Sequence, residues 1–93
     1  MKELEFESYL LDDKSIKSKI KAVKSRINKA KMVERHFNNS LDNLVCNDEV
    51  MFETLKRIKN EMNDTNGTIS NSVRKYYVFC NKKCFPTLKE YHK

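Results

Sequence analysis

Apolar residues recur at helical spacing along the chain and predict a first and a second helix. Residues 4–11 place Phe6, Tyr9 and Leu10 at i, i+3 and i+4, the spacing of one helix face. A longer stripe predicts a second helix from Ser15 to about Phe37, because Asn and Ser at residues 38–40 favour turns and caps. The stripe of this second helix consists of Ile16, Ile20, Val23, Ile27, Ala30 and Phe37.

The second half of the chain predicts two more helices. Residues 41–45 read as a short apolar connector on the core, and Asn47 or Asp48 can cap a third helix. The polar loop 63–67 then precedes a fourth helix, with Thr65 or Thr68 as its cap. The buried face of the third helix is predicted to hold Met51, Leu55, Ile58 and Met62. The core side of the fourth is predicted to hold Ile69, Val73, Tyr76, Tyr77 and Cys80.

Length and composition support an all-α fold, a small four-helix bundle formed by residues 1–93 as one domain. Ninety-three residues suit one domain with a modest core. The chain has one Gly and one Pro, which disfavours the many tight turns of an all-β fold. The predicted core is Phe6, Tyr9, Ile20, Val23, Ile27, Leu55, Ile58, Val73 and Tyr76.

Charge is segregated along the chain. The formal net charge is +6. Residues 1–13 carry a net charge of −4, residues 14–35 carry nine basic side chains against Glu34 alone, and residues 74–93 carry a net charge of +5. A balance of this kind suits a polyanionic partner.

Within the second helix the basic residues form a stripe of their own. Together with Asn28, they recur at alternating steps of three and four residues, which places them on one helix face about 100° from the apolar stripe. Adjacent like charges repel, so such a face indicates an anionic partner. We expect nucleic-acid phosphates, DNA in particular, to contact Lys14, Lys17, Lys21, Lys24, Lys31 and Arg35, with Arg74 and Lys75 of the fourth helix as a second contact.

Two other interpretations of this charge remain open. The basic face can be an ordinary solvated surface of a lysine-rich protein. It can also serve a protein partner, as in a small phage-type inhibitor that acts on a host enzyme of nucleic-acid metabolism. We expect no membrane partner, because no apolar run approaches the roughly 20 residues of a membrane span. The acidic N-terminal residues do not resemble a signal peptide, so we expect a cytoplasmic protein of a bacterial or phage-infected cell.

The sequence predicts no enzymatic chemistry, no cofactor and no small-molecule substrate. An odd count of three cysteines argues against a disulfide framework. Cys80 and Cys84 lack the tight paired spacing of structural zinc sites, and we expect Cys80 in the core. A chain with one glycine has no Gly-rich phosphate loop. Most of the aromatic run Tyr76, Tyr77 and Phe79 is expected in the core as well.

Three segments carry a resemblance to a known family. Residues 6–10 read FESYL, residues 14–20 read KSIKSKI, and residues 67–79 read GTISNSVRKYYVF. These segments resemble motifs of the SAM-like core-binding domain of tyrosine recombinases and phage integrases. The resemblance covers roughly residues 4–82. It implies a helical DNA-binding module whose second and fourth helices face the DNA.

The departure from that family concerns catalysis. Recombinases follow this domain with a catalytic domain that carries Arg, Lys, His and a Tyr nucleophile, and no such constellation surrounds Tyr76, Tyr77 or Tyr91 in this sequence. The resemblance therefore implies a free-standing binding module from a phage or another mobile element, without the catalytic domain.

Overall fold

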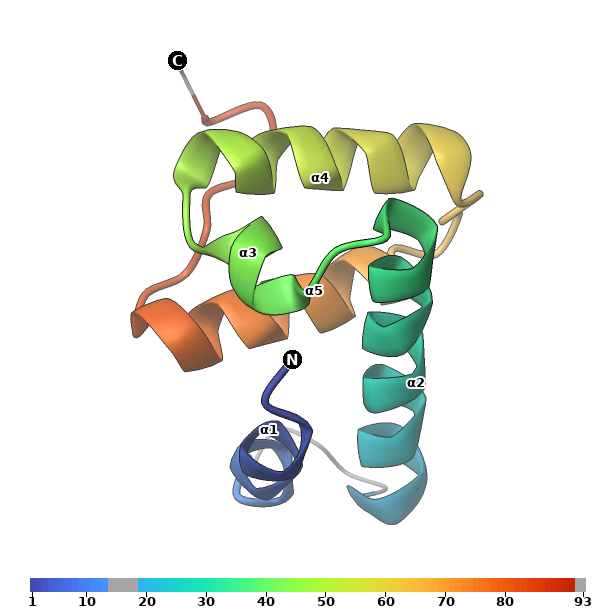
Figure 1. Cartoon of the computed structure of the whole chain (residues 1–93), viewed down its shortest axis with the longest axis vertical. Coiled ribbons are helices and arrows are strands. Elements are labelled where there is room, and N and C mark those ends of the chain that lie inside the picture. Colours follow the sequence, from blue (N-terminus) through green and yellow to red (C-terminus); the bar gives the residue numbers. More distant parts are fainter. Residues whose placement is uncertain (14–18, 92–93) are drawn as a thin grey trace.

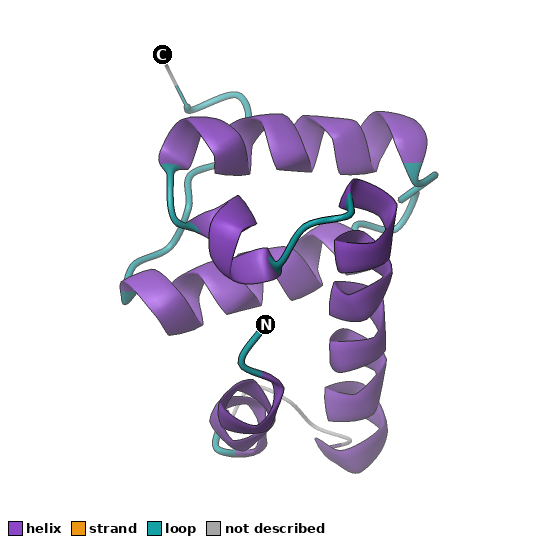
Figure 2. Cartoon of the chain, in the orientation of Figure 1, coloured by secondary structure: helices purple, strands orange, loops and turns teal. Residues whose placement is uncertain are grey.

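The computed structural model describes residues 1–13 and 19–91 and shows an all-helical protein (Figures 1 and 2). The helices in these two ranges are α1 (Glu3–Leu11), α2 (Lys19–Phe37), α3 (Leu41–Val45), α4 (Asp48–Glu61) and α5 (Thr68–Asn81). The prediction of a small helical bundle is confirmed. The apolar connector of residues 41–45 adds α3 as a short fifth helix.

Helix α5 lies at the centre of the packing. In Figure 1, α4 runs above α5, α3 lies between them, α2 stands at one end and α1 is seen end-on below. α5 contacts all four other helices, and α1 also packs against α2. The acidic first helix is therefore a neighbour of the basic second helix, a proximity that matters for the charges described below.

The buried side chains explain this arrangement. Of the nine predicted core residues, the structure buries Phe6, Val23, Ile27, Leu55, Ile58, Val73 and Tyr76, and partly buries Tyr9. Tyr76 and Tyr77 satisfy their buried hydroxyl groups by donating hydrogen bonds to Asp42 and Asp48. Burial and the bond to Asp48 raise the pKa of Tyr77 to about 12, so it stays a neutral donor.

Two core predictions were wrong. Ile20 is 70% exposed, because the buried positions 23, 27, 30 and 33 centre on a direction about 75° away from it around the helix. Val33 takes a fully buried place in the stripe instead. Cys80 is exposed and lies in the last turn of α5.

The helix starts follow the prediction in one case and depart from it in another. Asn47 caps α4, and its side chain accepts hydrogen bonds from the backbone N–H groups of Glu49 and Val50. Neither Thr65 nor Thr68 caps α5, which starts after Gly67 in the left-handed conformation. Asp64 caps it from further away, accepting from the N–H groups of Ile69 and Ser70 and from the Ser70 hydroxyl.

Candidate nucleic-acid interface

Helix α2 presents the predicted basic stripe on its exposed side. Lys21, Lys24, Asn28, Lys31 and Arg35 are all exposed, while the same helix buries Val23, Ile27, Ala30 and Val33 on its other side. The apolar contacts with α1 and α5 fix the rotation of the helix, so they also fix the direction of the stripe. Lys14 and Lys17 lie outside the described residues.

The acidic first helix neutralises only one member of the stripe. Lys31 Nζ pairs with Glu3 Oε1 at 3.1 Å. Lys21, Lys24 and Arg35 form no ion pair with any residue of the described ranges. Three exposed cations on one helix face are therefore without a carboxylate partner in residues 1–13 and 19–91. We call Lys21, Lys24, Lys31 and Arg35 the α2 stripe.

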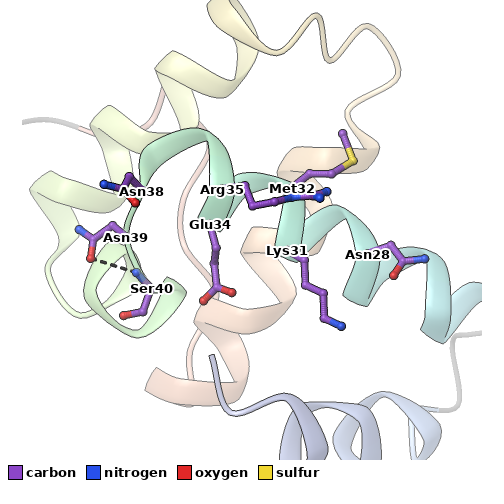
Figure 3. A pocket seen from close by; sticks show the side chains of 8 residues that line it. All are labelled: Asn28, Lys31, Met32, Glu34, Arg35, Asn38, Asn39 and Ser40. Atoms are coloured by element: carbon purple, nitrogen blue, oxygen red, sulfur yellow. Dashed lines mark hydrogen bonds between the residues drawn. The ribbon is translucent and has the colours of Figure 1, made fainter.

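The C-terminal half of the stripe borders a surface hollow of about 880 Å³ (Figure 3). Lys31 and Arg35 line it together with Met32, and the close-up shows Lys31 and Glu34 pointing to one side while Arg35 and Met32 point to another. The other lining side chains are polar: Asn28, Asn38, Asn39 and Ser40. With Glu34, which also lines it, the hollow thus combines two cations and one carboxylate with several amide groups.

Hydrogen bonds hold the walls of this hollow. Glu34 accepts from the Leu41 backbone N–H at 2.8 Å and pairs with the Met1 amino group at 3.0 Å. Burial works against the charge of that amino group, but its hydrogen bonds to Glu34 and Asp42 prevail and raise its pKa above the ordinary 8.0. Asn39 accepts from the Ser40 N–H at 2.9 Å. Glu34, the acidic residue of α2 itself, is therefore already engaged.

The two predicted cations of α5 are placed differently from those of α2. Arg74 is only partly exposed and donates from Nη1 to the carbonyl oxygens of Phe85 and Pro86, at 2.9 and 3.1 Å. Lys75 Nζ pairs with Asp13 Oδ2 at 2.6 Å. Both side chains thus hold other parts of the chain, and the structure does not join them to the exposed face of α2.

Base specificity, if the helices supply it, was expected from the polar residues Ser18, Ser25 and Asn71, and the described ones among them have other neighbours. Ser25 accepts a hydrogen bond from Lys29 Nζ at 2.7 Å, and Ser25 and Asn71 line a small cavity of about 170 Å³ between α2 and α5. Ser18 lies outside the described residues. The amide groups nearest the stripe are Asn28, which its spacing in the sequence already places within the stripe, and Asn38 and Asn39. In the sequence, Asn38 and Asn39 predict only the end of the second helix.

Residues 1–13 and 19–91 form no metal-ligand cluster and no membrane-spanning helix. No group of three His, Cys, Asp or Glu side chains in these ranges is arranged to hold a metal ion. Cys46, Cys80 and Cys84 are all exposed. None of the described helices combines the length and apolar character needed to cross a bilayer.

Comparisons with known proteins give no family for this chain. No protein-family model, no curated protein and no solved structure matches it. The residues and their geometry therefore carry the functional argument.

Proposed function

We propose that this protein binds nucleic-acid phosphates, with duplex DNA as the preferred target, through the α2 stripe. The observation that carries the proposal is the set of three exposed cations, Lys21, Lys24 and Arg35, without ion-pair partners in the described ranges. A phosphate backbone offers a row of negative charges that such a row of cations neutralises with release of counterions.

The geometry of the stripe supports a helix lying along or in a groove. Steps of three and four residues keep its members on one side of α2, and the major groove of DNA is wide enough to admit an α-helix. Asn28 lies within the stripe and is exposed. Its amide group has the donor and acceptor arrangement that pairs with adenine in the major groove, so it is the proposed base contact.

The resemblance to recombinase core-binding domains supports the same face. It implies DNA contacts from the second and fourth principal helices, which here are α2 and α5. Because Lys75 pairs with Asp13 and the structure does not join Arg74 to the exposed face of α2, we assign the contacts with the duplex backbone to α2.

Binding to a labelled duplex as a function of salt tests the proposal. With about four phosphate contacts, log K against log salt has an expected slope of about −4. Lys21, Lys24 and Arg35 replaced together by Gln should flatten the slope by about 3 and abolish measurable binding above roughly 100 mM salt.

A matched control removes the same charge elsewhere. Lys56, Lys59 and Lys89 are exposed and lie outside the stripe, so their replacement by Gln should leave the slope within about one of the wild type. Equal losses in both triple variants would show a nonspecific charge effect and reject the α2 stripe as the site.

A protein partner with an acidic surface is the second candidate function. It is favoured by apolar side chains exposed on the same helix, since Ile20 is 70% exposed and Met32, 40% exposed, lines the hollow beside Arg35. Apolar contacts add affinity that salt does not screen. Absence of duplex binding at roughly 50 mM salt would favour this candidate, because phosphate contacts are strongest at low salt.

A further inference from the structure

A second cationic site lies on a different side of α2, at its junction with α5. A cavity of about 430 Å³ is lined by Arg26 of α2, by Asn71, Arg74, Lys75 and Val78 of α5, and by Phe85 of the C-terminal segment. Three of these side chains are basic, and no carboxylate is among the described residues that line the cavity. Arg26 follows Lys24 by two residues, which places the two side chains about 160° apart around the helix.

Arg26 is the least satisfied of the three cations. Its Nε atom is buried and has no hydrogen-bond partner among the described residues. Its side chain also forms no ion pair within those ranges. A buried donor on a charged group is costly when it is left without an acceptor, so this position favours a ligand that supplies one.

Arg74 is held so that most of its donors remain available. Nη1 bonds to the carbonyls of Phe85 and Pro86, while Nε and Nη2 bond to no described residue. The Phe85 ring lies 5.8 Å from the guanidinium carbon. Burial lowers the pKa of Arg74 from its usual value, and no carboxylate in the described part of the chain pairs with it. Lys75, the third cation, is already paired with Asp13.

We propose that this cavity binds a phosphate monoester, with its oxygen atoms held between the guanidinium groups of Arg26 and Arg74. Guanidinium groups present several N–H donors in a planar fork that matches phosphate oxygens. A phosphate monoester also carries nearly two negative charges at neutral pH, which two arginines balance. Val78 and Phe85 add an apolar wall for the organic part of the ligand, and the volume is that of a small-molecule site.

This site is independent of the α2 stripe. A ligand in the cavity and a duplex on the stripe approach α2 from nearly opposite sides, and the two share no cation. The monoester can be a free metabolite such as a nucleotide or the 5′-terminal phosphate of a nucleic-acid strand. Both ligands present the same phosphate group to the two arginines. Measurements with nucleotides and with oligonucleotides are therefore needed to distinguish them.

Nitrogen–proton NMR of the arginine Nε–H groups gives a direct test. We expect titration with inorganic phosphate, at ionic strength held constant with NaCl, to shift the Arg26 Nε–H signal along a saturable curve. AMP should act in the same way with half-saturation at about 1 mM or below, and adenosine should leave the signal in place. Loss of the charged group abolishes the interaction, so adenosine is the ligand control.

Variants locate the site. Arg26→Lys keeps the positive charge but lacks the planar fork, so we expect AMP affinity to fall about tenfold or more. Lys24→Gln changes the opposite side of the same helix and should leave AMP affinity within about twofold. If Arg26→Lys fails to fold, Arg74→Lys tests the second guanidinium in the same titration.

Paired oligonucleotides with and without a 5′-phosphate identify the source of the ligand. Tighter binding of the phosphorylated strand, lost in Arg26→Lys, assigns the site to a strand terminus, while equal binding of both strands assigns it to a small metabolite. A wild-type Arg26 signal that does not saturate with phosphate or AMP, or variants that bind AMP like the wild type, would overturn the proposal. The triple Gln variant of the α2 stripe should keep its AMP affinity, so the two proposals can fail separately.

Discussion

Helices α2 and α5 both carry cations, yet the fold uses them for different purposes. Lys21, Lys24 and Arg35 of α2 project from an exposed face without ion pairs in the described ranges. Arg74 and Lys75 of α5 instead fasten the C-terminal segment and the end of the first helix. Charge that looks equivalent in the sequence is thus available for a ligand on one helix and largely engaged on the other.

The difference follows from where each helix lies. α5 is contacted by every other helix, so its long polar side chains reach backbone carbonyls and carboxylates of neighbouring segments. α2 stands at one end of the bundle with a single buried side (Figure 1). Lys75 and Nη1 of Arg74 therefore hold neighbouring segments, whereas Lys21, Lys24 and Arg35 project from the edge of the bundle.

The largest difference in folding stability is expected between substitutions on the buried and the exposed side of α2. Ile27 is 4% exposed and Ile20 is 70% exposed. Ile27→Ala should lower the free energy of unfolding by about 2–4 kcal/mol, because it removes buried methyl groups and leaves a cavity. Ile20→Ala should change it by less than about 0.5 kcal/mol. Urea unfolding of both variants measures this; similar losses would mean that Ile20 belongs to the core after all.

The next largest difference in folding stability is expected between substitutions of an arginine in α5 and an arginine in α2. Arg74→Gln removes a charged donor from two carbonyl oxygens and should cost about 1–3 kcal/mol of folding stability. Arg35→Gln changes an exposed side chain and should stay within about 0.5 kcal/mol. Thermal and urea unfolding give the comparison. Equal stability of the two variants would remove the structural role assigned to Arg74.

The start of α5 should depend on a single carboxylate. Asp64→Ala removes the acceptor for two backbone N–H groups and should cost about 1 kcal/mol. Burial opposes ionisation of Asp64, but the hydrogen bonds from Ser70 and Ile69 prevail and lower its pKa below 3.8. The depressed pKa means that this stabilisation is present above about pH 4 and is lost as pH falls through the folded-state pKa.

Unfolding measured between pH 2 and pH 7 tests the sign of that dependence. Wild-type stability should decline on acidification by more than that of Asp64→Asn, which keeps an acceptor oxygen but has no carboxylate to titrate. A wild type and an Asn variant with parallel pH profiles would contradict the role given to the ionised cap.

The smallest effect is expected at Lys75. Its ion pair with Asp13 is partly exposed to solvent, and Lys75→Gln should cost about 0.2–1 kcal/mol at low salt. Because salt screens such a pair, the difference from the wild type should shrink in roughly 1 M NaCl. A loss that persists undiminished at high salt would indicate that packing of the lysine stem dominates over the charge.

Local patterns were enough to predict the four longer helices and the basic side of α2, but not the short helix α3. The spacing of Val23, Ile27 and Ala30 marks a helix with one buried side, and the spacing of Lys21 and Lys24 marks a separate basic side. Asn47 could be predicted as a cap of α4, because the side chain of an N-cap residue bonds to backbone N–H groups only two or three residues further along the chain. These features depend on neighbours along the chain, so the sequence alone determines them.

Contacts between distant segments decided the rest. Ile20 and Cys80 fit an apolar helix face by spacing, but whether a partner covers them depends on where other helices end. Arg74 is engaged because residues 85 and 86 return to it, and Arg26 meets Arg74 in one cavity because α2 crosses α5 there. Helical periodicity determines on which side of a helix a side chain lies. Only the tertiary structure determines which residues contact it there.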